Sequence, residues 1–155
     1  RAFKVLRHLG TRCLIHQPKY SMLDRWVEAG LLDLLEKEKV GCITFSSLAQ
    51  GLLTDKYLNG IPADSRAGRH LENGAIVESQ VTTEVIKKIK QLNKLAVERN
   101  QSLAQMALAW VLKDPRITSI ILGASKPQQV TDSIAAIKNY DFSKKELKKI
   151  EKILK

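Results

Sequence analysis

The sequence predicts an α/β protein with about three parallel strands and flanking helices. Three observations predict it. Short apolar runs alternate with amphipathic helical patterns, turn residues bound each run, and strand and helix follow one another along the chain. The runs cover residues 13–17, 40–45 and 117–122. Three strands alone do not make a well-covered parallel sheet, so the order fits the last part of a (β/α)₈ barrel or a small doubly wound sheet.

The first part of the chain predicts a helix end, a strand, a helix and a second strand. Residues 1–9 are typical of the last turns of a helix, closed by Gly10. The strand 13–17 stops at Pro18, which has no N–H group to donate to a neighbouring strand. Leucines with charged residues between them predict an amphipathic helix over 26–39, and the second strand follows it.

The second part of the chain is mostly helical. Glycine, proline and asparagine interrupt residues 52–80, and so long an irregular stretch is usually functional or mobile. Apolar spacing predicts a helix over 82–100, and a nearly all-apolar, buried helix over 103–113. A last helix begins after Ser143. Two capping boxes, Ser102 with Gln105 and Ser143 with Glu146, mark helix starts.

The stretch 117–129 predicts a buried strand that turns directly into a helix. Pro127 suits the first helical turn, and Ser125 with Gln128 has capping-box spacing. The free N–H groups at such a helix start favour an anion such as phosphate, to which Lys126 would add positive charge. An ordinary strand-to-helix loop without a ligand is the alternative.

Size and composition indicate about one globular domain. The chain has 155 residues, of which 44% are hydrophobic, and has neither an 18-residue apolar run nor a signal-peptide pattern. Because the first residue is Arg1 rather than Met and residues 1–9 already have the pattern of a helix end, we expect a piece of a longer protein. Cys13 and Cys42 are expected to be buried reduced thiols, which suits the cytoplasm. His8, His16 and His70 lack metal-ligand spacing, so we expect no metal site.

The net charge of +10 raises the question of nucleic acid. The lysines are spread over several predicted helices, and aromatic residues make up only 5% of the chain, which is too few for a base-stacking platform. We therefore expect neither a nucleic acid nor a membrane as a partner.

Polar or aromatic residues end all three predicted strands. Gln17 offers an amide, Phe45 a flat apolar ring, and residues 123–129 a phosphate seat. In a (β/α)₈ barrel these ends share the carboxyl-terminal face, where ligands bind. The three groups suit the carboxamide, ring and phosphate of a nicotinamide dinucleotide, although each alone is more often a local cap or a core residue.

Several long motifs resemble the aldo-keto reductase superfamily, in the branch of bacterial glyceraldehyde-phosphate-type reductases and potassium-channel β subunits. The similar segments are 16–20 with Arg25, then 45–57, 60–66, 103–110 and 121–129. They cover nearly the whole chain in order. The resemblance implies that 1–155 is the C-terminal half of one (β/α)₈ TIM-barrel domain without its N-terminal half.

The resemblance also implies a reaction and a cofactor site. The reaction would be reduction of an aldehyde or ketone by hydride transfer from NADPH. Gln17 would bind the carboxamide and Phe45 would stack on the nicotinamide. Ser125 and Gln129 would bind the 2′-phosphate after Gly123, with Asp132 near the adenine. The remaining residues, which would line or charge the pyrophosphate site, are Ser46, Leu48, Gly51, Lys56 and Arg66.

The family's catalytic Asp, Tyr, Lys and His lie in the half of the barrel that this sequence does not contain, so we expect no catalytic residue here. His16, Tyr20, Lys56 and Tyr57 match other motif positions. The resemblance thus implies the cofactor half of a cytoplasmic enzyme with a small carbonyl substrate, and a fragment that is inactive alone. An NADPH-binding regulatory subunit of the potassium-channel β type is the alternative. A half barrel on its own would pair with another copy, because two sheet edges would be exposed.

Overall fold

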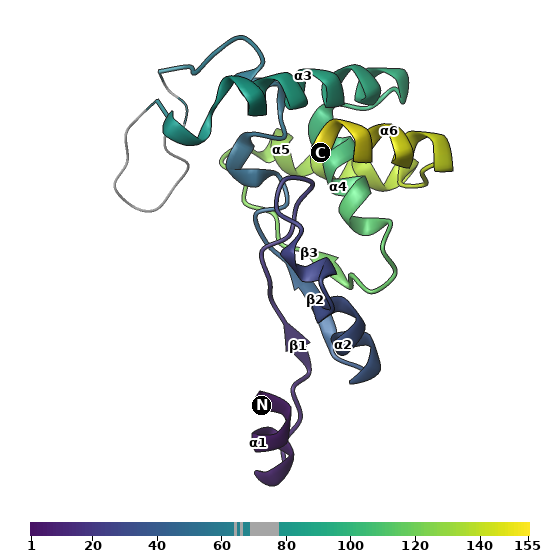
Figure 1. Ribbon diagram of the computed structural model, residues 1–155. Helices are drawn as coiled ribbons and strands as arrows, with labels where there is room; N and C mark the ends of the chain where they lie inside the picture. The colour runs from purple at the N-terminus through teal and green to yellow at the C-terminus, as the bar shows by residue number, and fades with distance from the viewer. Residues whose placement is uncertain (64, 66, 69–77) are drawn as a thin grey trace.

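A three-stranded parallel sheet runs through the molecule (Figure 1). The computed structural model describes residues 1–63, 65, 67–68 and 78–155. The strands are β1 (Ile15–His16), β2 (Gly41–Thr44) and β3 (Ser119–Ile120), in the order β1-β2-β3. The predicted parallel α/β arrangement is confirmed. The outer strands are shorter than predicted, since each has a single neighbour in the sheet with which to form hydrogen bonds.

Helices connect and flank these strands. They are α1 (Ala2–His8), α2 (Leu31–Lys37), α3 (Thr83–Glu98), α4 (Leu103–Leu112), α5 (Pro127–Ile134) and α6 (Lys144–Leu154). α2 leads from β1 to β2 and packs on β2, whereas α3 and α4 come between β2 and β3. α3, α4 and α6 pack together beyond one end of the sheet, and α1 lies beyond the other (Figure 1).

Side-chain caps fix several helix starts. The Ser102 hydroxyl accepts from Gln105 N at 3.1 Å, and Gln105 Oε1 accepts from Ser102 N at 3.0 Å. Ser143 and Glu146 form the same reciprocal pair at the start of α6. Both predicted capping boxes are confirmed. Thr82 caps α3 by a single hydrogen bond, which its hydroxyl accepts from Val85 N.

The helix predicted over 26–39 is wrong as a single element. The chain forms a 3₁₀ helix over Trp26–Glu28, then a turn, and then α2. Gly30 separates the two pieces with φ of 96°, a left-handed conformation that an α-helix does not contain. Leucine spacing predicted the apolar face correctly, since Leu32 and Leu35 are buried, but it carries no signal for the break.

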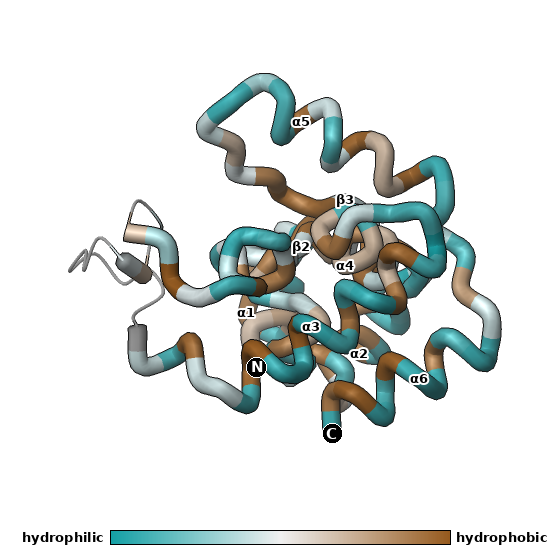
Figure 2. The backbone as a smooth tube through the Cα atoms, turned by 90° about the horizontal axis from the view of Figure 1, so that it is seen from above, coloured by the Kyte–Doolittle hydropathy of each residue, from teal (hydrophilic) through white to brown (hydrophobic). Residues whose placement is uncertain are grey.

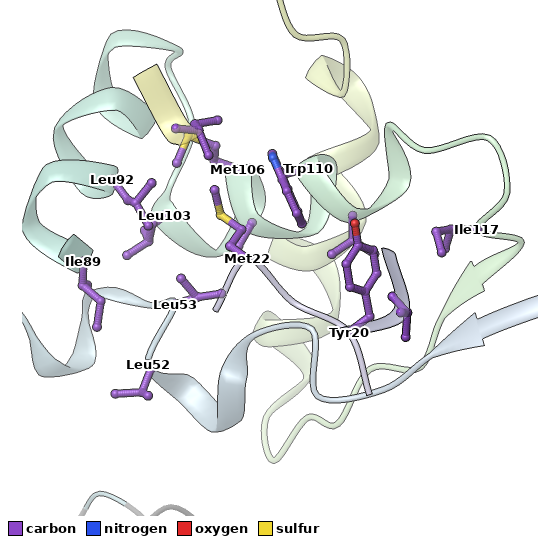
Figure 3. Close-up of a cluster of buried hydrophobic side chains, with 14 of the residues drawn as sticks. Tyr20, Met22, Leu52, Leu53, Ile89, Leu92, Leu103, Met106, Trp110 and Ile117 are labelled. Atoms are coloured by element: carbon purple, nitrogen blue, oxygen red, sulfur yellow. The ribbon is translucent and has the colours of Figure 1, made fainter. Parts of the chain in front are cut away.

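Helix α4 forms the centre of the core (Figure 3). Leu103, Met106 and Trp110 are all at most 2% exposed, so the predicted burial of this helix is confirmed. The Tyr20 ring lies 5.6 Å from the Trp110 ring between centroids and joins the chain after β1 to the helix. In Figure 2 the brown, hydrophobic segments of β2, β3 and α4 likewise lie toward the middle of the molecule.

The third strand is not buried as predicted. Ile121 and Leu122 are 43% and 39% exposed, and on the other side of the sheet Leu14 and Ile15 are 73% and 56% exposed. Both pairs lie on or beside the two outer strands, where no further strand of the described chain covers them. An apolar run indicates a strand that other elements must cover. The described residues contain no such element over the outer sides of β1 and β3.

Three further predictions concern the cysteines, the irregular stretch 52–80 and membrane-spanning helices. Cys42 is buried and Cys13 half-buried, and both are free thiols, as predicted. The described parts of 52–80 contain only short 3₁₀ helices beside loops, at Asp55–Tyr57 and Glu78–Gln80. Among the residues placed in the structure, no helix has the length and apolar character needed to cross a membrane.

Candidate functional site

The carboxyl ends of the three strands lie along one edge of the sheet. His16 aligns with Cys42, and Thr44 aligns with Ile120, in parallel pairing. Gln17, Phe45 and Ile121 therefore follow their strands at the same edge. Beyond β1, the chain stays beside Phe45: Phe45 N donates to Pro18 O at 3.1 Å, and Tyr20 N donates to Phe45 O at 3.3 Å.

Gln17 and Phe45 present exposed side chains at this edge. Phe45 is 38% exposed, although its N–H and C=O groups are both bonded to the segment 18–20. Gln17 is exposed, and within the part of the chain that the structure describes its amide forms no hydrogen bond. This edge thus presents an apolar ring face and an amide donor and acceptor on neighbouring strands, which is the pair of groups predicted from the sequence.

The segment directly after β2 has an unusual backbone conformation. Ser46, Ala49 and Gln50 have φ of 54°, 48° and 57°, and Gly51 has 103°. A right-handed residue followed by a left-handed one, as at Leu48 and Ala49, forms concave backbone that can bind an anion. The N–H groups at 46, 47 and 48 donate to none of the described residues.

Backbone geometry adds one group that the sequence did not indicate. Ser47 was not predicted as a site residue, and its hydroxyl is occupied by Thr44 Oγ1 at 3.1 Å. Its N–H group is nonetheless free between those of Ser46 and Leu48. No side-chain pattern could have indicated it, because the backbone conformation alone leaves this donor unpaired.

The turn after β3 differs from the predicted capping box. The N-cap of α5 is Lys126 rather than Ser125, and the side-chain partner is Gln129 rather than Gln128. Gln129 Oε1 accepts from Ser125 N at 2.8 Å, from Lys126 N at 3.2 Å and from Ser125 Oγ at 3.2 Å. The prediction failed because a Gln side chain three residues after Lys126 reaches the free N–H groups without help from a serine cap. An acceptor oxygen therefore already lies at this helix start.

The remaining predicted cofactor-binding residues are Gly123, Lys56, Asp132 and Arg66. Gly123 is exposed, and an added Cβ there would meet nothing within 4 Å, so open space adjoins the turn. Lys56 is exposed and forms no ion pair with the described residues. Asp132 is exposed, and its Oδ1 accepts from Gln128 Nε2 at 2.9 Å. Arg66 lies outside the described residues, as does His70.

The two buried tyrosines are structural. Tyr20 is fully buried, and its hydroxyl donates to Glu28 Oε1 at 2.7 Å. Burial, reinforced by the Glu28 carboxylate, raises the pKa of Tyr20 well above its usual value. Tyr57 is also fully buried and accepts from Ala67 N at 3.5 Å. Both phenol hydroxyls are thus engaged within the fold, Tyr20 with Glu28 and Tyr57 with Ala67.

The described residues contain no group of three or more His, Cys, Asp or Glu side chains that could hold a metal ion. Two surface hollows lie elsewhere. One is lined by lysines of α6, and the other by residues 36, 113–116, 140–142 and 147.

Comparison with known proteins gives a family and close relatives. Residues 1–155 match the model of the Aldo/keto reductase family. The chain is 48% identical over 150 residues to L-glyceraldehyde 3-phosphate reductase of Escherichia coli K12, a match covering 96% of this chain and 43% of that protein. It is 36% identical over 130 residues to a probable voltage-gated potassium channel subunit beta of Oryza sativa, covering 80% and 38%. The chain thus spans less than half the length of these curated relatives.

Solved structures show what larger fold this chain resembles. A glycerol dehydrogenase from Gluconobacter oxydans superposes with a TM-score of 0.72 at 23% identity, covering 94% of this chain and 44% of that one. The holo form of an aldo-keto reductase from Bacillus halodurans gives 0.69 at 20% identity, covering 100% and 48%. At such identities the likeness concerns the fold alone. It confirms the partial (β/α)₈ barrel over the doubly wound sheet.

Proposed function

Because the chain belongs to the aldo/keto reductase family, we propose that it forms most of the cofactor site of an NADPH-dependent oxidoreductase. The intact protein would reduce a small aldehyde or ketone by hydride transfer. One observation carries the proposal: Gln17, Phe45 and the free N–H groups at 46–48 lie along the same edge of the sheet, which the turn at 123–129 also borders.

Each part of this edge fits a part of the dinucleotide. Gln17 can both donate to and accept from the carboxamide, and the exposed face of Phe45 can stack on the nicotinamide ring. The free N–H groups beside Gly51 suit a pyrophosphate, with Lys56 adding positive charge. The N–H group of Leu48 is one of these free donors.

The turn before α5 fits the 2′-phosphate. A phosphate oxygen bonded to the N–H groups of Ser125 and Lys126 would take the place of the Gln129 oxygen. The Gln129 amide would then be free to turn its NH₂ group toward the phosphate, while Asp132 lies one turn further along α5, where we place the adenine. This exchange would let Gln129 cap the helix without a ligand and contact the phosphate when the cofactor is bound.

The chain contributes binding and orientation rather than proton transfer. When bound, the cofactor supplies the hydride. Gln17 and Phe45 would fix one face of the reactive ring toward the site, and the Phe45 backbone is held there by hydrogen bonds to the segment 18–20. The proton donor is expected from outside this chain, so residues 1–155 alone would catalyse no reduction. We place the intact enzyme in the cytoplasm.

Cofactor titration of the intact protein tests the 2′-phosphate assignment. Quenching of tryptophan fluorescence would be followed with NADPH and, separately, with NADH. Ser125→Ala and Gln129→Ala should each weaken NADPH binding by about tenfold, since a hydrogen bond to a charged group contributes about 1.5–3 kcal/mol. NADH binding should change by less than about twofold because NADH lacks the 2′-phosphate.

Thr131→Ala is the matched control. Thr131 is exposed on the same helix and its side chain is not among the predicted contacts. The variant should bind both cofactors like the parent protein. Unchanged NADPH affinity in the two test variants would show that the turn at 123–129 does not bind the 2′-phosphate.

A second function is favoured by the Oryza sativa relative, a probable voltage-gated potassium channel subunit beta. In that case the intact protein would bind NADPH at the same edge and regulate a partner. Loss of NADPH absorbance with a panel of small aldehydes separates the two. Multiple turnover supports the enzyme, and cofactor binding without turnover supports the regulatory subunit.

A further inference from the structure

The outer side of α6 is a lysine face. Five lysines line one hollow there: Lys144, Lys145, Lys148, Lys149 and Lys152. At 3.6 residues per turn they occupy an arc of about 140° around the helix. The opposite side carries Ile150, which is fully buried, and Ile153, which packs against the core. The apolar side of α6 is therefore already used within the fold.

Both glutamates of α6 lie outside this arc, Glu146 on the apolar side of the helix and Glu151 just beyond Lys144, and both form ion pairs with arginines of the fold. Glu146 forms an ion pair with Arg99, whose side chain is 5% exposed. Glu151 pairs with Arg25 at 2.7 Å. Among the described residues, the five lysines form a single ion pair, Lys149 with Glu98 at 3.0 Å. The outer side of α6 is thus almost purely cationic.

Helix α3 lies beside α6 and also carries exposed lysines. α3 and α6 pack against each other (Figure 1), and the Lys149–Glu98 pair connects them. Lys87, Lys90 and Lys94 are exposed on α3, within an arc of about 60° opposite its buried side. We define the lysine surface as Lys87, Lys90 and Lys94 of α3 with Lys144, Lys145, Lys148 and Lys152 of α6.

Although the sequence alone led us to expect no membrane partner, we propose that the lysine surface adsorbs to an anionic phospholipid bilayer. Clusters of four to eight basic residues on an amphipathic helix are typical of such binding. The surface holds no arginine fork for bidentate phosphate contacts and no aromatic residue for base stacking, which disfavours nucleic acid. Because the apolar side of α6 is packed in the core, adsorption is electrostatic, without insertion. None of these lysines belongs to the proposed cofactor site.

Vesicle co-sedimentation of the intact protein tests the proposal. The protein should bind phosphatidylcholine vesicles that contain phosphatidylglycerol, and should not bind phosphatidylcholine alone. Binding should be lost in about 1 M NaCl, where the Debye length is about 3 Å. The triple variant K144E/K148E/K152E should bind at least about tenfold more weakly, because it reverses the centre of the surface.

A matched variant separates the surface from net charge. K4E/R12E/K37E changes the net charge by the same amount at exposed residues that form no ion pair with the described residues. It should keep binding within about twofold. Equal loss in both triple variants, or no binding of the parent protein, would overturn the proposal. So would binding to duplex DNA or RNA without binding to vesicles.

Protection of lysines from acetylation tests the proposal without a variant. Vesicles should slow acetylation of Lys144, Lys148 and Lys152 relative to Lys4 and Lys37, as measured by peptide mass spectrometry. Circular dichroism would check that both triple variants keep the parent helix content. Uniform acetylation with and without anionic vesicles would contradict the proposed face.

Discussion

Asp114 shows how one side chain can couple the stability of this fold to pH. Its carboxylate accepts from Arg116 Nε at 2.9 Å and from Arg116 Nη2 at 2.6 Å, and Arg116 also pairs with Asp33 of α2. The Asp114 side chain is 12% exposed. Hydrogen bonds from Arg116 lower the pKa of Asp114 and outweigh the effect of burial. The ionised form is therefore favoured in the folded protein.

We predict that Asp114→Asn lowers the free energy of unfolding at pH 7 by about 1–3 kcal/mol. A carboxyl whose pKa is lowered by folding contributes stability above its unfolded pKa of about 3.9. That contribution is lost as the pH falls through the lower pKa of the folded state. Urea unfolding at pH 7 and at successively lower pH should show the difference between parent and variant shrinking.

A second aspartate provides the comparison for that series. Asp55 is exposed and forms no ion pair with the described residues, so Asp55→Asn should change the free energy of unfolding by less than about 0.5 kcal/mol. A gap between parent and Asp114→Asn that stays constant down to acid pH would contradict the assigned role of Asp114.

At the same scale, the sequence predicts side chains of the candidate site better than its backbone. Gln17 and Phe45 could be proposed because residue type and position at a strand end are visible in the sequence. The N–H group of Ser47 could not, because its availability depends on φ at Ser46 and nearby residues. The N-cap of α5 lies one residue later than predicted. Gln128 and Gln129 are adjacent, and the sequence does not show which side chain bonds back to the N-cap.

Helix starts were more predictable than helix interiors. Ser102 and Ser143 cap α4 and α6 as expected, because a capping box depends on residues only three apart. The stretch 26–39 looked continuous, because glycine inside a helical pattern lowers helix propensity without showing which conformation the glycine adopts. Gly30 takes the left-handed conformation at the N-cap of α2, so the helix begins later.

Gly30→Ala tests this explanation. An added Cβ at Gly30 would meet nothing within 4 Å, so only the backbone conformation opposes the substitution. We expect the free energy of unfolding to fall by about 1–2 kcal/mol, the cost of a left-handed conformation for a residue with a Cβ. Asn at the same position should cost less, because Asn tolerates this conformation.

Thermal or urea unfolding of Gly30→Ala and Gly30→Asn would measure the difference. Ala29→Ser, which changes the neighbouring exposed residue without a positive φ, is the control. If Ala and Asn at position 30 were equally stable, the backbone of Gly30 would not be the reason that the helix divides.

For the whole molecule, the alternation of strand and helix predicted a parallel sheet and left two architectures open. The motifs, and later the family match, selected the barrel. What alternation could not predict is which apolar residues remain uncovered. Exposed apolar side chains lie beside β1, beside β3 and along α5 and its 3₁₀ continuation Ala135–Asn139: Leu14, Ile15, Ile121, Leu122, Val130, Ile134 and Ile137. These segments are the ones that further strands and helices of a barrel would cover.

We predict that residues 1–155, prepared alone, self-associate through these apolar segments. Sheet edges and contiguous apolar residues exposed to water favour association. Sedimentation velocity over a concentration series should show a dimer or larger species. The variant I134S/I137S should weaken the association by about tenfold or more, since each buried Ile contributes about 1.5–3 kcal/mol.

Val97→Ser is the control, because Val97 is 65% exposed on α3, away from both edges of the sheet. A monomer at all concentrations, or equal weakening by Val97→Ser, would mean that the uncovered barrel segments do not drive association.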